Sequence, residues 1–267
     1  MRQDDQETGM GRAGRAQAIA ALLLGSRPMG GAEPEVQQTR RGARLVQNGS
    51  VLSEVLAKPG ATDSVFDVLA AAIQIFSPGD RVGILGFAAG GLIAPLRAMS
   101  GDHNLSGVDL DRAGYELFCE LSGAWQGDVQ FVQTDAVKWL QAQRGKFDLL
   151  LEDLSVGRDG DVFKPDVSID TLPQLIQSIL KPGGVAVFNL LPADDRTWAE
   201  MTAKVCAPFG FGVQVLFENY HNRVVVLGNK ALPATHEASQ LLREPLAAIG
   251  SEMATDISVR SLRLAKR

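Results

Sequence analysis

Three aspartates stand at the ends of predicted strands, where their carboxylates could bind one ligand. Asp109 ends the strand predicted from "LSGVDL", Asp135 follows "VQFVQ", and Asp153 ends "KFDLLLED". Carboxylates accept hydrogen bonds from hydroxyl and amino groups, the polar groups of sugars and bases. The carboxyl ends of parallel strands meet at one edge of an α/β sheet, and ligands bind there. We therefore expect the three side chains to converge on a single site.

A turn rich in small residues lies in "RVGILGFAAGGLIAPL", residues 81–96. Gly86, Ala88 and Gly90 fall between a predicted strand and a predicted helix, where small residues let the backbone approach a ligand. Close packing at a strand–helix junction also selects small residues, so the turn alone leaves both interpretations open. Asp109 follows Gly86 by about 20 residues, the spacing at which a carboxylate accepts ribose hydroxyls. The turn and the aspartates together predict a nucleoside site.

The aspartates have alternative roles. A carboxylate at the ribose would repel the 2′-phosphate of NADP, but it does not exclude NAD as the ligand. Any of the three aspartates could instead cap a helix, most obviously Asp135, which directly precedes "AVKWL". Asp153 could cap backbone amides at the strand end or act on a substrate. Glu152 should point to the opposite face of the strand from Asp153, because side chains alternate along a strand.

Short apolar runs alternate with helical patterns through the middle of the chain. The predicted strands of this alternation cover residues 81–87, 105–110, 129–133, 146–153 and 185–191. Such alternation predicts a parallel sheet with helices on both faces. The last two strands, 211–218 and 223–229, are joined by a few residues and must be antiparallel if adjacent, because a parallel pair needs a crossover of about a dozen residues. This order predicts an α/β protein with a Rossmann-like class I methyltransferase fold: a mostly parallel seven-stranded sheet with one antiparallel hairpin strand.

The two ends of the chain are expected to differ from this middle region. Residues 1–42 are predicted to be a disordered leader, and residues 43–62 to form a small β-hairpin around Asn48-Gly49, the strongest local signal for a tight hairpin turn. Asp63 or Ser64 should cap the first helix of a nucleoside-binding domain over residues 63–230. Residues 231–267 are predicted to be a helical tail.

Composition excludes several classes of function. The net charge of −5 and the pI near 5.3 give no support for nucleic-acid or anionic-membrane binding. Cys119 and Cys206 are far apart and the three histidines are scattered, so no metal site is expected. An apolar run near the N-terminus faintly resembles a signal peptide, but acidic residues precede it, whereas a signal peptide begins with a basic segment. A cytoplasmic protein with a small-molecule substrate is the prediction.

The stretches "RVGILGFAAGG", "GVDLD", "FVQTDAVKWL", "KFDLLLEDLS" and "ILKPGGVAVFNL" together resemble spermidine synthases and their methyltransferase-fold relatives, over about residues 43–230. The resemblance implies an S-adenosylmethionine cofactor or its decarboxylated form, and a homodimer. It implies that Gly86, Ala88 and Gly90 line the methionine and ribose portion of the cofactor and that Asp109 binds the ribose hydroxyls. Asp135 with Ala136 would lie against the adenine. Asp153 matches the aspartate near the attacking amine and is the candidate catalytic residue.

The sequence also departs from that family. Spermidine synthases have "GGGDGG" where this chain has "GFAAGG", so Ala89 replaces a carboxylate, and "DLSVG" replaces "DSSDP". A Tyr-His-Glu run is replaced by Val65-Phe66-Asp67, which keeps only an acid. A polyamine pocket needs several carboxylates to offset the desolvation of its ammonium groups.

Three hypotheses for function follow from the resemblance and these departures. Methyl transfer to a small molecule stands ahead of aminopropyl transfer by a polyamine synthase, and a non-catalytic binding module is the third. Residues 156–168 are either a lid over the substrate or a surface connection. Tyr220 and His221 are expected to be exposed turn residues.

Overall fold

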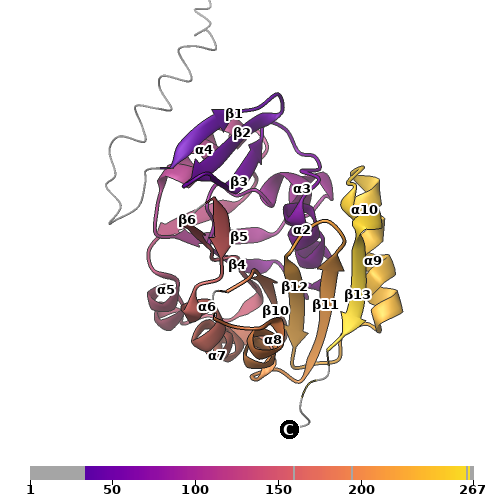
Figure 1. The fold of residues 1–267 in the computed structure, drawn as a ribbon. Coiled ribbons are helices and arrows are strands. Elements are labelled where there is room, and N and C mark those ends of the chain that lie inside the picture. The colour runs from indigo at the N-terminus through magenta and orange to yellow at the C-terminus, as the bar shows by residue number, and fades with distance from the viewer. Residues whose placement is uncertain (1–33, 159, 194, 263, 265–267) are drawn as a thin grey trace, which may run out of the picture.

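A central sheet with helices on both faces forms the body of the protein, and a small second sheet lies over one edge of it (Figure 1). The computed structural model describes residues 34–158, 160–193, 195–262 and 264. The eight strands of the central sheet are, in spatial order, β13 (Ile257–Ser261), β11 (Phe211–Phe217), β12 (Arg223–Gly228), β10 (Leu180–Leu190), β7 (Phe147–Glu152), β4 (Arg81–Leu85), β5 (Asn104–Asp109) and β6 (Val129–Gln133).

The strand directions confirm the predicted fold class. Strands β10, β7, β4, β5 and β6 run parallel, and β12 lies between β10 and β11 and is antiparallel to both. The short connection between β11 and β12 therefore makes the predicted hairpin. The sheet has one strand more than the seven predicted, because β13 pairs antiparallel with β11 at the edge of the sheet.

Two layers of helices bury the two faces of the sheet. The helices are α2 (Val65–Phe76), α3 (Ile93–Ala98), α4 (Ala113–Ser122), α5 (Ala136–Ala142), α6 (Asp166–Asp170), α7 (Leu172–Ile179), α8 (Trp198–Cys206), α9 (Thr235–Ala248) and α10 (Met253–Asp256). Side chains of α2, α3, α4 and α9 pack on the face that carries Leu149 and Leu151, while α5, α7 and α8 pack on the face that carries Leu150. Alternate residues of β7 thus enter opposite cores, as expected for a strand buried on both faces.

The N-terminal sheet has three strands rather than the two of the expected hairpin: β1 (Glu35–Gln38), β2 (Gly42–Gln47) and β3 (Ser50–Leu56). Asn48 and Gly49 make the β2–β3 turn with φ of 51° and 79°, as the turn signal predicted. Strand β1 falls in the segment expected to be a disordered leader. That expectation is wrong for residues 35–38, which pair with β2. Most of the rest of the predicted leader, residues 1–33, lies outside the described residues.

The C-terminal segment is not only helical. It contains α9 and α10, as predicted, and then β13, which completes the sheet. No helix in the described ranges is long and apolar enough to cross a bilayer. The same ranges contain no group of three or more His, Cys, Asp or Glu side chains that could hold a metal ion.

Candidate active site

One cavity of about 520 Å³ opens at the carboxyl edge of the parallel strands. The ends of β4, β5, β6 and β7 line it, together with the N-terminal sheet, the start of α2 and the β11–β12 connection. Its volume lies within the range of small-molecule sites, about 300–1,000 Å³. Asp109, Asp135 and Asp153 all line this cavity, as do Gly86, Ala88, Gly90 and Ala136. The residues proposed from the sequence are therefore brought together at one place.

The turn after β4 can only be built around glycine at its first position. Gly86 has a φ of +84°, and a Cβ there would lie 2.6 Å from the carbonyl oxygen of Asp153. The amide of Asp153 in turn donates to the carbonyl of Leu85 at 2.8 Å. The backbones of the β4 and β7 ends are thus in direct contact, which brings Asp153 next to the turn.

Asp109 holds the turn in place. Its Oδ2 accepts a hydrogen bond from the amide of Ala88 at 2.7 Å, and its Oδ1 accepts one from the amide of Asp111 at 3.2 Å. Burial raises the pKa of Asp109 above its usual value, and these backbone hydrogen bonds oppose that effect. The carboxylate therefore lies between the cavity and the backbone of the turn.

Asp135 has the capping role that the sequence left open. Its Oδ1 accepts a hydrogen bond from the amide of Lys138 at 3.0 Å and caps α5. The residue nevertheless lines the cavity, together with the adjacent Ala136. Capping fixes the carboxylate at the cavity wall, so the two roles are compatible.

Asp153 is part of a chain of polar side chains. Its Oδ1 accepts a hydrogen bond from Nδ2 of Asn189 at 2.7 Å, and Oδ1 of Asn189 accepts one from Nδ2 of Asn222 at 2.9 Å. Burial raises the pKa of Asp153 to about 7, against the opposing effects of the Lys164 charge and the Asn189 hydrogen bond. This carboxyl group can therefore exchange a proton near neutral pH.

Asn189 and Asn222 were not identified from the sequence. Asn189 lies within the buried strand β10. A polar residue in such an apolar run needs a hydrogen-bond partner, so the asparagine in "VAVFNLL" could have been identified as a candidate site residue. Asn222 lies in the β11–β12 connection, and its contact depends on the tertiary fold.

Glu152 points away from the cavity, as the strand alternation predicted. It is fully buried with Lys164, whose Nζ lies 2.7 Å from Oε2 of Glu152. Oε1 of Glu152 accepts hydrogen bonds from Ser168 at 2.6 Å and from the amide of Leu154 at 3.0 Å. This ion pair joins the end of β7 to the segment that follows it.

The connection after β7 forms a hairpin against the N-terminal sheet. Strands β8 (Val156–Arg158) and β9 (Asp161–Phe163) pair with each other. Nδ2 of Asn48 donates to the carbonyl of Gly157 at 3.0 Å, and Oγ of Ser50 donates to the carbonyl of Asp161 at 2.9 Å. Val162 lines the cavity. Part of the predicted lid-or-surface segment therefore covers the cavity, held by the β2–β3 turn.

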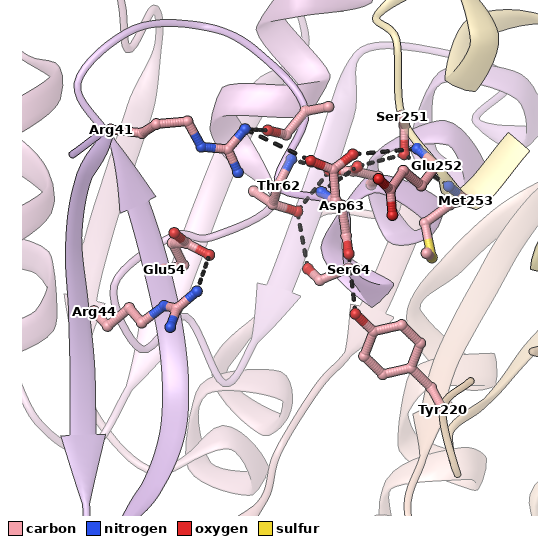
Figure 2. A network of polar contacts seen from close by, with 12 residues as sticks. Arg41, Arg44, Glu54, Thr62, Asp63, Ser64, Tyr220, Ser251, Glu252 and Met253 are labelled. Atoms are coloured by element: carbon pink, nitrogen blue, oxygen red, sulfur yellow. Dashed lines mark hydrogen bonds and ion pairs between the residues drawn. The ribbon is translucent and has the colours of Figure 1, made fainter. Parts of the chain in front are cut away.

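A network of polar contacts joins the N-terminal sheet, the start of α2, the β11–β12 connection and the C-terminal segment (Figure 2). The hydroxyl of Tyr220 donates to the carbonyl of Asp63 at 2.9 Å, and the amide of Glu252 donates to Oδ1 of Asp63 at 3.1 Å. Tyr220 is 37% exposed in the turn, as expected, but it also lines the cavity, which the sequence did not predict. His221 is exposed, as expected.

Asp67 is the anchor of the same network. It is fully buried, and its carboxylate accepts hydrogen bonds from the amide and hydroxyl of Thr62, from the amide of Asp63 and from the hydroxyl of Ser251. These four donors satisfy the carboxylate. Asp67 is not among the described residues that line the cavity. The acid retained in "VFD" therefore has a structural role.

Three comparisons relate this arrangement to known proteins. The sequence matches no protein-family model and no curated protein sequence. Among solved structures, a probable spermidine synthase from Corynebacterium glutamicum ATCC 13032 has a TM-score of 0.68 at 16% identity over 88% of this chain and 91% of that one. Spermidine synthase from Thermotoga maritima has a TM-score of 0.57 at 12% identity over 87% and 77%. Human methyltransferase-like protein 13 in complex with SAH has a TM-score of 0.54 at 18% identity over 68% and 89%.

The chain has the class I methyltransferase fold that spermidine synthases share. Within that fold, two positions where spermidine synthases carry acids are altered. Ala89 is fully buried and does not line the cavity, and Val156 replaces the second acid of "DSSDP" on the β8–β9 hairpin. Phe87, in place of a glycine, packs its ring against Tyr115, Phe118 and Phe131 in the core.

Proposed function

We propose that this protein is a transferase that binds an S-adenosylmethionine-type nucleoside and transfers a methyl group to a small-molecule acceptor. The observation that carries the proposal is the convergence of Asp109, Asp135 and Asp153 on one cavity beside the Gly86 turn. Fold similarity to methyltransferases and spermidine synthases supports it.

The residues present fit such a nucleoside. Gly86, Ala88 and Gly90 would lie along its ribose and amino-acid portion, and Asp109 would accept hydrogen bonds from the ribose hydroxyls. Asp135 would accept from the amino group of adenine, beside Ala136. Leu110 lines the cavity and is 67% exposed, so it presents an apolar surface that a flat base could cover.

The chain's own contribution to the reaction is positioning and proton transfer. When bound, the cofactor supplies an electrophilic methyl group on a positively charged sulfur. Asp153 would orient the acceptor's hydroxyl or amine and take its proton, and a carboxyl with a pKa of about 7 is suited to that role. Asn189, held by Asn222, would keep the Asp153 carboxylate in one orientation. The β8–β9 hairpin and the N-terminal sheet would exclude water.

One observation favours a second candidate, aminopropyl transfer from decarboxylated S-adenosylmethionine. Among the described residues that line the cavity, there is no Lys, Arg or His to pair with the carboxylate of intact S-adenosylmethionine. The decarboxylated form lacks that group. Against it stand buried Ala89 and the fully occupied Asp67, because aminopropyl transfer to a polyamine needs acids at those places. A homodimer is part of the proposal and rests on the family resemblance. A cytoplasmic location is also proposed, from the two cysteines that form no disulfide framework and the acidic residues before the N-terminal apolar run.

Ligand-dependent thermal stability tests the proposal. A ligand present at 100 times its Kd stabilises the folded state by about 2.7 kcal/mol. S-adenosylmethionine, its decarboxylated form, 5′-methylthioadenosine and NAD should be compared on the wild type and on Asp109→Ala, with the exposed Asp161→Ala as the matched control. We expect stabilisation by S-adenosylmethionine that Asp109→Ala removes and Asp161→Ala keeps.

The other outcomes of that experiment separate the alternatives. A response to the decarboxylated form alone would favour aminopropyl transfer, and a response to NAD alone would contradict the transferase proposal. No response to any of the four would favour the non-catalytic binding module. Gel filtration at two protein concentrations tests the homodimer.

A further inference from the structure

The part of the cavity wall that lies outside the strand ends is mostly apolar. The N-terminal sheet contributes Leu45, Val51 and Leu52, and the start of α2 contributes Val65 and Phe66. Val51 is 48% exposed although it is a β-branched apolar residue in a strand. An apolar surface that faces a cavity favours an apolar ligand, since binding removes that surface from water.

Phe66 has a defined place in this wall. A Cβ on Gly91 would lie 3.0 Å from its ring, so the ring packs directly on the backbone of the glycine turn. Ser53 contacts the same backbone, because its Oγ accepts a hydrogen bond from the amide of Gly91 at 3.1 Å. The ring therefore borders the place where the cofactor and the acceptor would meet.

The charged side chains among the described residues that line the cavity are all acidic, and most of them accept hydrogen bonds from the backbone. Of the described lining residues, the charged ones are Asp109, Asp111, Asp135 and Asp153. The first three accept hydrogen bonds from the backbone amides of Ala88, Asp111, Ala113 and Lys138. Because the proposed nucleoside would also engage Asp109 and Asp135, Asp153 is the carboxylate left for an acceptor. An anionic acceptor would meet four aspartates without a cation, and a polyamine would have to desolvate two or more ammonium groups for one carboxylate.

From these observations we propose that the acceptor is an uncharged molecule with an apolar body and one polar group, the body lying against Phe66 and the N-terminal sheet and the polar group at Asp153 and Asn189. This inference rests on the proposed function, since it names the substrate class of the same site. Phe66 and Val162 are then specificity-determining residues, placed on α2 and on the β8–β9 hairpin. The chain would thus differ from the spermidine synthases it resembles in fold by accepting a neutral substrate.

Binding experiments test the proposal without any turnover. The neutral fluorescent probe N-phenyl-1-naphthylamine and the dication putrescine are titrated against protein saturated with S-adenosylhomocysteine. We expect the probe to bind with micromolar affinity and putrescine to give no signal at millimolar concentration. Phe66→Glu should weaken the probe at least tenfold. Phe211→Glu is the matched control, since Phe211 is 45% exposed on β11 and lines a different groove.

Retained binding of S-adenosylhomocysteine shows that Phe66→Glu is folded. Val162→Glu on the β8–β9 hairpin is a second variant and should also weaken binding of the probe at least tenfold. The inference is wrong if putrescine binds, if the wild type does not bind the probe, or if the probe responds to Phe211→Glu and not to Phe66→Glu. Failure of the wild type to bind S-adenosylhomocysteine contradicts the proposed function instead. In that case the probe titrations, repeated without it, still decide whether the cavity prefers a neutral ligand.

Discussion

The backbone amide of Ala88 donates a hydrogen bond to Oδ2 of Asp109 at 2.7 Å, and Ala88 has a φ of +45°. An L-residue with a side chain pays about 1–2 kcal/mol for this left-handed conformation. The hydrogen bond to a strand-end carboxylate offsets part of that cost. The turn thus stores strain at the edge of the cavity, which is common at ligand sites.

Replacing Ala88 by glycine should relieve this strain. Glycine adopts positive φ freely, although the unfolded chain gains flexibility, so we expect Ala88→Gly to raise the free energy of unfolding by about 0.5–1 kcal/mol. Urea denaturation measures the change. The neighbouring Ala89 has a negative φ and is fully buried, so Ala89→Gly should destabilise by a similar amount. If Ala88→Gly lowered the free energy of unfolding as Ala89→Gly does, the positive φ of Ala88 would carry no cost.

Gly86 and Gly160 offer a comparison between crowding and backbone strain. Both have a φ of +84°, but a Cβ on Gly86 would lie 2.6 Å from the carbonyl oxygen of Asp153, whereas a Cβ on Gly160 would meet nothing within 4 Å. We expect Gly160→Ala to cost about 1–2 kcal/mol of stability. Gly86→Ala should cost at least about 2 kcal/mol more, because the ends of β4 and β7 must separate. Thermal unfolding of both variants provides the test, and equal losses would contradict the close contact.

Asp153 should give stability a specific dependence on pH. Below about pH 4 its carboxyl is protonated in both the folded and the unfolded chain. Between about pH 4 and its folded pKa of about 7, the unfolded chain releases the proton and the folded chain keeps it, so stability falls as the pH rises. Above that range both states are ionised, and the loss is complete.

Asp153→Asn keeps the shape of the side chain and an acceptor for Asn189, and it removes this titration. Relative to the wild type it should be about 4 kcal/mol more stable at pH 8 and nearly equal at pH 4, measured by urea denaturation across that range. Burial also raises the pKa of Asp109 and Glu152, so the difference between the two proteins is the informative quantity. The exposed Asp161→Asn serves as the control. A constant difference at all pH values would contradict the raised pKa of Asp153.

The ion pair between Lys164 and Glu152 should be costly to break. Both side chains are fully buried, so Lys164→Met leaves a buried carboxylate without its cation and should cost about 3–5 kcal/mol. Burial already raises the pKa of Glu152, and Lys164 opposes this. The loss should therefore be larger at pH 8 than at pH 5, where Glu152 can take up a proton.

Lys181→Met is the matched control for that substitution. Lys181 forms a pair with Asp148 at 2.8 Å, nearly the same separation, but its side chain is 45% exposed. The Asp148 carboxylate is 10% exposed and keeps the hydrogen bond from the amide of Arg81 at 3.1 Å without Lys181. Because one partner is half-exposed, we expect a loss of about 1 kcal/mol, with less dependence on pH than for Lys164→Met. Similar losses for the two variants would mean that burial does not decide the strength of these pairs.

Local patterns in the sequence predicted most of the sheet and the convergence of three aspartates. Strand β6 has the predicted bounds, and the short connection between residues 217 and 223 correctly indicated the reversed strand β12. Strands β1 and β13 were missed because both are short and partly polar, and each exists only through pairing with a strand elsewhere in the chain. Local propensity carries no information about such partners.

The roles of individual loop residues were the least predictable part. Tyr220 lies in a segment with the composition of an ordinary turn. Only the fold brings its hydroxyl to the carbonyl of Asp63, 157 residues earlier in the sequence. Asp67 is the one acid kept where spermidine synthases have a Tyr-His-Glu run, and the four donors to its carboxylate come from two separate segments. Motif spacing identifies residues that meet at a sheet edge, but it does not show which acids are already satisfied.

The hydrogen bond from Ser251 to buried Asp67 also sets an order of events during synthesis. Every described residue that lines the cavity precedes residue 223, so all of them are synthesised before Ser251. Until then, a fully buried carboxylate lacks one of its donors, and the start of α2 lacks its support from the C-terminal segment. A nascent chain can therefore hold all the lining residues early, but the contact that completes the support of α2 forms only after translation has passed Ser251.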